Sequence, residues 1–369
     1  MERYYPHFDG IRAIAVFTVI VTHVWRWLPP GFPPIGTIAV QTFFALSGFL
    51  ITGILLNMKD QADAGESLGF LMGRFYARRS LRILPLYYLA IVVAVLIPIH
   101  DGFLSQVPWF LLYGSNWYTF IKAEWTGYLS HFWTLAVEEQ FYLLWPLAVL
   151  LMPRRALIPV FVTLMATSFV ARLGLVATGW KPHQIQVATF CQLEALVGGA
   201  LLALLVKEGR SVAAARLGIG AGLAALALLP VVMYCGMLKD ENPTALAVNV
   251  ALSTPMAACL GLFVIDRASR GIGGIAGRVL TLSPLVYMGR ISYGIYVWHN
   301  IVLRLTERRF AGAWARLDEI LPYLGSVTNL AVTTGLSVAV AAVTWHAFEA
   351  PINGLKRHFS YRRSGEARS

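Results

Sequence analysis

Two ionisable residues, Arg12 and His23, stand inside the first long apolar stretch of the chain. Their spacing of eleven residues corresponds on an α-helix to a rise of about 16 Å and a rotation of about 1100°, so both side chains face nearly the same way. A neutral imidazole held deep in an apolar bundle can act as a general base on a hydroxyl group. Asp9 is three residues before Arg12 and is placed to pair with it. The alternatives are an Arg12 that reaches toward lipid headgroups and a His23 that only joins two helices.

A cluster of arginines comes shortly before the apolar stretch that begins at residue 83. Arg78 and Arg82 are four residues apart and therefore project from one helical face, with Arg79 beside them. Guanidinium groups bind phosphate oxygens bidentately, so the cluster predicts a substrate that carries phosphate. The alternatives are ordinary positive charge on the cytoplasmic side of a membrane, or contact with anionic lipids.

Glu138 and Glu139 are adjacent carboxylates in another apolar stretch, with Tyr142 about one helical turn later. Adjacent residues of a helix diverge by about 100°, so the two acids cannot serve one partner equally. We expect one to orient a histidine or bind a sugar hydroxyl, and the other to pack against an arginine such as Arg172. The alternative is a purely structural ion pair.

A later run carries Arg290, Tyr293 and His299, which add a second deep histidine and aromatic hydroxyl groups. An aromatic belt at the membrane interface is the alternative interpretation. The second apolar stretch contains Ser47 followed by Gly48, a small pair that lets a helix or a ligand approach the backbone closely.

The elements that must hold these residues are long apolar segments. Apolar residues make up 57% of the 369 and charged residues 13%, against roughly 45–50% and 25% in soluble domains. The segments are about 20 residues long, as an α-helix needs to cross a hydrocarbon core of ~30 Å. We therefore predict an all-α, polytopic transmembrane helical bundle of ten spans, at residues 11–28, 36–57, 83–99, 131–152, 157–177, 188–206, 216–235, 245–265, 285–303 and 325–346.

Charge predicts the orientation of this bundle. The connections on the side of the two termini hold 19 Lys and Arg residues and the opposite connections hold 7, which places both termini in the cytoplasm. We expect a membrane domain over residues 1–353 and a basic cytoplasmic tail over 354–369. The arginine-rich segment 304–324 is expected to lie along the outer surface as an interfacial helix, and the aromatic segment 108–127 to be interfacial or re-entrant.

The composition also excludes classes of function. The formal net charge is +11, but Lys and Arg stand mostly at the ends of spans, and no polar segment is long enough for a soluble nucleic-acid-binding or catalytic domain. The cysteines, Cys191, Cys235 and Cys259, are far apart and without a CxxC spacing, so we expect packing roles and no metal site. The first apolar stretch lacks a cleavage site and is expected to be a retained helix.

In this order the segments resemble the membrane-bound acyltransferase type 3 family, which O-acylates sugars and other hydroxyl acceptors of envelope polymers and natural products. The resemblance extends over residues 4 to 353. It rests on Phe8-Asp9-Gly10 with the spacing of Arg12 and His23, on Ser47-Gly48-Phe49-Leu50, on Arg78-Arg79 with Arg82-Ile83-Leu84-Pro85, on Trp133 to Tyr142, on Gly289 to His299, and on Phe348-Glu349 with Pro351. The chain departs from the family at residues 192–196, where the family more often has Arg and Asp, so the resemblance gives no ion-pair partner there.

The resemblance implies an acyl-CoA-dependent O-acyltransferase of the inner (plasma) membrane, surrounded by lipids and without nucleic acid. It would move an acyl group, most often acetyl, from cytoplasmic acyl-CoA to a hydroxyl of a cell-envelope glycan or another sugar-containing acceptor. Acyl-CoA is then a co-substrate, and no bound cofactor or metal is expected. Some relatives carry a further extracytoplasmic transferase domain, so transfer here is expected to finish on the membrane domain or on a separate partner, and a homo-oligomer stays open.

The resemblance also suggests roles for the residues. His23 would be the base or the acyl carrier, Glu138 would orient it or bind the acceptor, and Ser47 would donate to the oxyanion. Arg12, Arg78, Arg79 and Arg82 would bind acyl-CoA, and the acceptor-binding or supporting residues would be Asp9, Glu139, Tyr142, Arg290, Tyr293 and His299. The other hypotheses are a proton-coupled exporter of an envelope precursor, with His23, Glu138 and His299 as a proton relay, and a sensory or scaffold protein.

Overall fold

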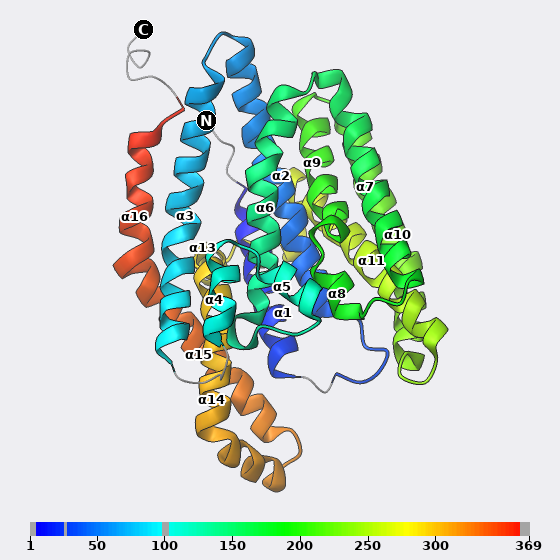
Figure 1. Cartoon of the computed structure of the whole chain (residues 1–369), viewed down its shortest axis with the longest axis vertical. Helices are drawn as coiled ribbons and strands as arrows, with labels where there is room; N and C mark the ends of the chain where they lie inside the picture. The colour runs from blue at the N-terminus through cyan, green and yellow to red at the C-terminus, as the bar shows by residue number, and fades with distance from the viewer. Residues whose placement is uncertain (1–4, 26–27, 98–102, 362–369) are drawn as a thin grey trace.

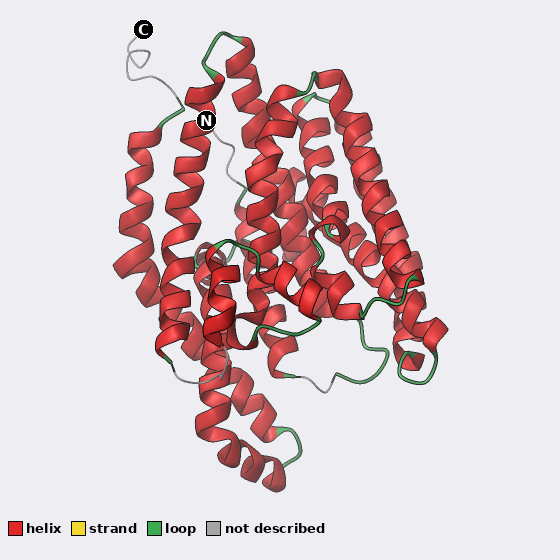
Figure 2. Cartoon of the chain, in the orientation of Figure 1, coloured by secondary structure: helices red, strands yellow, loops and turns green. Residues whose placement is uncertain are grey.

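The computed structural model describes residues 5–25, 28–97 and 103–361, and every regular element among them is helical (Figure 2). Most of the long helices run roughly along the long axis of the molecule (Figure 1). Eight segments are long and apolar enough to cross a membrane. They are α1 (Pro6–Val24), α2 (Ile35–Asp63), α3 (Leu68–Leu96), η1 with α6 (Gly127–Phe132, Trp133–Leu151), α7 (Arg154–Ala177), α10 (Ser211–Leu238), α11 (Pro243–Arg270), and α15 with η3, α16 and η4 (Leu324–Thr344, Trp345–Glu349, Ala350–Gly354, Leu355–Phe359). The prediction of an all-α polytopic membrane bundle is confirmed.

The predicted span at residues 188–206 corresponds to η2 (Thr189–Cys191) and to α9 (Leu193–Lys207), a helix of only 15 residues. The residues from Glu194 to Leu205 are all buried, with α9 packed against α2, α7, α10 and α11. Because protein surrounds α9, its length need not match the thickness of the hydrocarbon core.

Small residues bring α2 and α9 into backbone contact. A Cβ atom added at Gly48 would lie 1.8 Å from the carbonyl oxygen of Leu196, and one added at Gly199 would lie 2.0 Å from that of Ala45. Any larger residue at either position would push the two helices apart. The expected close approach of a helix at Ser47-Gly48 is confirmed.

The predicted span at residues 285–303 is divided at Ile291 into α13 (Ser283–Arg290) and α14 (Ser292–Ile320). Residues 304–320 do not form a separate helix, because α14 continues without a break to Ile320, and their position along the membrane surface stays a prediction. Together with α15, α14 forms a hairpin that extends beyond the other helices (Figure 1). No proline or glycine breaks the helix at this point, and Arg304 pairs with Glu307 at 3.2 Å along its surface.

The third span begins earlier than predicted. Helix α3 starts at Leu68, where the side chain of Ser67 accepts a hydrogen bond from the backbone of Phe70, so the arginine cluster lies within the helix. The aromatic segment 108–127 forms two short helices, α4 (Phe103–Leu111) and α5 (Ser115–Lys122), which are not among the eight spanning segments. The remaining helices are short as well: α8 (Pro182–Val187) and α12 (Gly274–Leu280).

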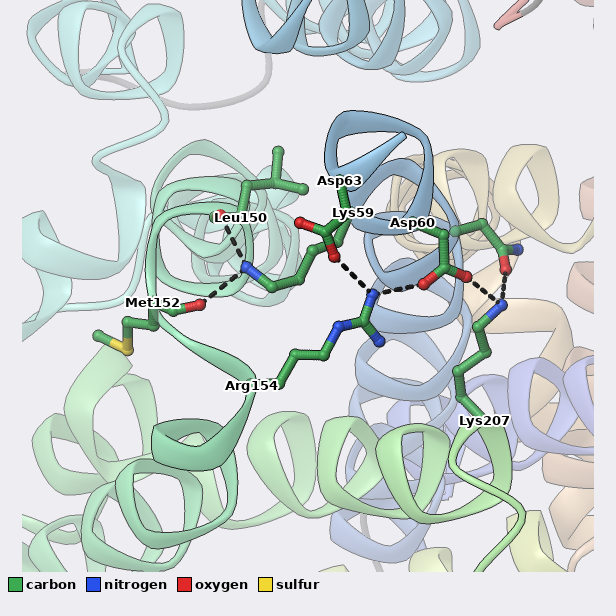
Figure 3. A network of polar contacts seen from close by, with 8 residues as sticks. Lys59, Asp60, Asp63, Leu150, Met152, Arg154 and Lys207 are labelled. Atoms are coloured by element: carbon green, nitrogen blue, oxygen red, sulfur yellow. Dashed lines mark hydrogen bonds and ion pairs between the residues drawn. The ribbon is translucent and has the colours of Figure 1, made fainter. Parts of the chain in front are cut away.

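A polar network joins four helix ends at one end of the bundle (Figure 3). Arg154 of α7 bonds to Asp60 of α2, and Lys207 of α9 bonds to Asp60 at 2.7 Å. Lys59 of α2 donates to the carbonyls of Leu150 and Met152, at the end of α6, over 2.8 Å each. This end network joins three connections that the charge pattern assigns to the cytoplasmic side. The cytoplasmic position of both termini stays a prediction.

The expected basic tail begins as packed structure. Arg74 and Arg78 of α3 donate to the carbonyls of His358 and Lys356, at 2.6 and 3.2 Å. Residues 355–359 are therefore held against α3, and residues 362–369 of the expected tail lie outside the described part of the chain.

Candidate active site

Helix α1 runs past three cavities. The basic cavity, of about 420 Å³, is lined by residues that include Asp9, Arg12, Arg82, Arg290, Tyr293, Glu349 and Lys356. The central cavity, of about 140 Å³, is lined by residues that include Arg12, Ser47, Arg79, Arg82, Glu138, Glu139, Tyr142 and Tyr293. The histidine cavity, of about 440 Å³, is lined by residues that include His23, His131, Trp133, Gln186 and Asn249.

Neighbouring cavities share part of their lining, which places them in series. The basic and central cavities share Arg12, Leu50, Arg82 and Tyr293. The central and histidine cavities share Val40, Thr134 and Tyr296, which we call the partition. The prediction that Arg12 and His23 face nearly the same side of α1 is confirmed in this sense: Arg12 faces the first two cavities and His23 faces the third.

The arginines differ in how they are paired. The predicted pair of Asp9 and Arg12 is confirmed, with 2.9 Å between carboxylate and guanidinium. Arg79 lies 5.1 Å from the centre of the Tyr142 ring. Neither Arg79 nor Arg82 forms an ion pair within the residues that the structure describes. Both line the central cavity, and Arg82 also lines the basic cavity. The positive charge of this region is therefore available to a bound anion.

Arg78 is the one predicted acyl-CoA-binding residue that the structure does not bring to the cavities. Its guanidinium donates to the carbonyl of Lys356 and lies 5.3 Å from the centre of the Tyr361 ring. Arg78 and Arg82 are on the same side of α3, but the chain after α16 covers the first of them. This places Arg12, Arg79 and Arg82 together and leaves Arg78 at the packed tail.

Ser47 is the centre of a hydrogen-bonded chain in the central cavity. Its hydroxyl donates to a carboxylate oxygen of Glu138 and accepts a bond of 2.9 Å from the hydroxyl of Tyr142. In this arrangement the only hydrogen of the Ser47 hydroxyl is engaged by Glu138, so it is not directed at an oxyanion. One carboxylate oxygen of Glu139 is buried without a hydrogen-bond partner among the described residues.

The expected pairing of these acids with Arg172 is wrong. Arg172 bonds instead to Glu194, which lies on the neighbouring helix α9, and to the carbonyl of Cys191. This finding also gives the ion-pair partner of the segment at residues 192–196. The positive charge of Arg79 interacts electrostatically with the carboxylates of both Glu138 and Glu139.

Three histidines from different helices meet at the histidine cavity. The Nδ1 atom of His23 lies 2.9 Å from the Nε2 atom of His299. The ring of His131 is 4.6 Å from that of His299 and 6.5 Å from that of His23, between ring centres. Glu138 lines the central cavity and not this one, and the side chain at hydrogen-bond distance from His23 is that of His299 rather than that of the expected Glu138.

A family model described as "Acyltransferase domain" matches residues 5–346. The chain belongs to this acyltransferase family. It is 28% identical over 330 residues to the peptidoglycan O-acetyltransferase OatA of Listeria monocytogenes, covering 83% of this chain and 50% of that protein. It is 27% identical over 378 residues to the O-acetyltransferase OatA of Staphylococcus aureus, covering 95% of this chain and 57% of the relative.

The chain thus spans about half the length of the curated relatives it matches. No solved structure matches it. The family and the helices together make it a multi-pass membrane protein.

Four residues of the chain were not predicted as part of the site. His131 contacts the two predicted histidines, Thr134 and Tyr296 form the partition with 2.6 Å between their hydroxyl oxygens, and Glu349 lines the basic cavity although it is buried. His131 opens the predicted span that contains Glu138, and an ionisable residue at this position was a usable signal. Glu349 stands within a motif of the resemblance. Thr134 and Tyr296 also stand within motifs of the resemblance, but their contact with each other joins two helices and has no local spacing that predicts it.

Proposed function

We propose that this acyltransferase moves an acyl group, most simply acetyl, from acyl-CoA to a hydroxyl group of a cell-envelope glycan. The observation that carries the proposal is the series of cavities along α1, which leads from the arginines that line the basic cavity to His23. The two relatives are O-acetyltransferases, and one of them is a peptidoglycan O-acetyltransferase, which supports the acceptor class.

The donor would enter at the basic cavity. Arg12 and Arg82, with Arg290 and Lys356, offer positive charge to the phosphates of coenzyme A, and guanidinium groups favour such oxygens. The central cavity is only about 140 Å³ in volume, so it suits the slender thiol arm and the acyl group rather than the nucleotide. The thioester would then lie against the partition, with His23 beyond it.

The acceptor would enter at the histidine cavity, where Trp133, Gln186 and Asn249 offer an apolar face and amide groups to a sugar. His23 would take the proton of the acceptor hydroxyl as the hydroxyl oxygen attacks the thioester carbonyl carbon. The carbon–sulfur bond then breaks, and the departing thiolate takes the proton from His23. Proton transfer by a positioned side chain contributes about 10²- to 10⁴-fold in rate. The alternative route, in which His23 carries the acyl group, uses the same contacts.

The test replaces the proposed base. In a bacterial host that lacks its own O-acetyltransferase, peptidoglycan O-acetyl groups are measured as the acetate that mild base releases. In a second assay, the purified protein is supplied with radiolabelled acetyl-CoA. We expect His23→Ala to lower transfer at least about 10²-fold while the protein stays folded in the membrane. Near wild-type transfer in this variant would remove His23 from the mechanism.

A matched control is His183→Ala. The ring of His183 lies 3.0 Å from the carbonyl of Ala123 and is not part of the lining of the three cavities. Its loss is expected to leave transfer unchanged.

Movement of a glycan precursor across the membrane without consumption of acetyl-CoA would instead support the proton-coupled exporter.

A further inference from the structure

We propose that His299 is a positioning residue that holds His23 in a single tautomer, with the proton on Nδ1 and the basic lone pair on Nε2. The inference rests on the proposed function, in which His23 is the base. In this inference His299, which is buried, determines which nitrogen of His23 reacts.

The first step is the protonation of His299. Its Nδ1 atom lies 2.6 Å from the carbonyl oxygen of Tyr296, one turn earlier in α14. A carbonyl oxygen only accepts hydrogen bonds, so Nδ1 of His299 carries a proton. The side chain is fully buried, and no carboxylate contacts it within the described residues. Because an uncompensated buried charge is costly, His299 is neutral and its Nε2 atom is an acceptor.

The second step follows from the contact between the two rings. The Nε2 atom of His299 is 2.9 Å from the Nδ1 atom of His23. An acceptor at this position requires a proton on Nδ1 of His23, and the neutral ring then has its lone pair on Nε2. The carbonyl of Tyr296 therefore sets the tautomer of His299, which in turn sets the tautomer of His23.

The third histidine keeps this arrangement in place without joining it. His131 lies against His299 with its ring at 69° to that of His299, and its Nε2 atom is 3.3 Å from the carbonyl of Val297. It therefore supports the ring of His299 by packing. When His23 takes a proton from the acceptor, its Nδ1–H group donates from a charged ring, and the bond to His299 becomes stronger.

The experiment compares two variants of His299. His299→Leu removes the acceptor atom and keeps an apolar side chain of similar size. His299→Gln keeps a carbonyl oxygen that can accept from Nδ1 of His23 at nearly the place of Nε2. Rates of acetyl transfer from acetyl-CoA to solubilised peptidoglycan strands give kcat and KM, and His183→Leu is the matched control.

We expect His299→Leu to lower kcat about 10²-fold with the KM for acetyl-CoA unchanged, because His299 does not line the cavities that would bind the donor. His299→Gln is expected to restore most of the rate. A merely structural role predicts that both variants lose folded protein together and that neither separates kcat from KM.

Equal kcat values for the Leu and Gln variants would overturn the inference. If His23→Ala is inactive and the two His299 variants are equal, only the role of His299 fails. If His23→Ala is active, His23 is not the base, and the mechanism under the proposed function is contradicted.

Discussion

Arg172 and Arg82 are both arginines of membrane-spanning helices, and they differ in what surrounds them. The side chain of Arg172 is 1% exposed, and its guanidinium donates to both carboxylate oxygens of Glu194 and to the carbonyl of Cys191. Ser168 donates to the same carboxylate at 2.7 Å. Arg82 has no ion pair within the described residues and faces two cavities.

The difference shows that an ionisable residue inside a membrane protein does not by itself mark a functional site. Arg172 is buried, is bonded to partners within the fold and is not part of the lining of the three cavities, so it does not face a place where a ligand could bind. Arg82 lines two cavities, where a bound anion would accept hydrogen bonds from its guanidinium. We therefore expect loss of Arg172 to affect stability, and loss of Arg82 to affect binding.

The largest effect is expected for Arg172→Leu. Removing one partner of a buried ion pair leaves the carboxylate of Glu194 uncompensated, which costs about 3–5 kcal/mol of folding free energy. Thermal unfolding in detergent, followed by circular dichroism, measures the loss. The double variant Arg172→Leu/Glu194→Leu removes the stranded charge as well and should recover much of the stability. An unchanged unfolding temperature in the single variant would show that the pair is not structural.

The second effect is expected for Arg82→Ala, with Arg78→Ala as its control on the same helix. A hydrogen bond to a charged group contributes about 1.5–3 kcal/mol, so loss of Arg82 should raise the KM for acetyl-CoA about 10- to 100-fold with folding little changed. Arg78 contacts the carbonyl of Lys356 rather than a cavity, so its loss should leave KM within about twofold. A larger effect for Arg78 would reverse the assignment of the two side chains.

The sequence predicted what depends on a single helix. The side shared by Arg12 and His23, and the pair of Asp9 with Arg12, follow from helical periodicity along α1, and the structure has both. The helical bundle itself followed from the length of the apolar stretches, because a helix is the form in which an unbroken apolar segment satisfies its backbone within a membrane.

The sequence did not predict what depends on two helices. The partner of Arg172 is Glu194 rather than Glu138 or Glu139, because close contact of α9 with its neighbours fixes how each helix is rotated. The contact between His23 and His299 joins residues 276 positions apart, and no local spacing encodes it. Arg78 was misplaced for a related reason: periodicity gives the side of the helix, but not what covers it.

The smallest effect is expected for Asp60 of the end network. Its side chain is ion-paired, as that of Arg172 is, but it is exposed, as that of Arg82 is. The side chains of Asp60 and Arg154 are 44% and 36% exposed. Exposed ion pairs contribute about 0–1 kcal/mol, so Asp60→Asn should lower the unfolding free energy by less than about 1 kcal/mol and leave kcat and KM unchanged. Unfolding temperatures of both proteins at low and high salt measure the effect, because salt screens exposed charges and should reduce the difference. A loss as large as that of Arg172→Leu would mean that pairing alone, and not burial with pairing, decides which charges hold this fold together.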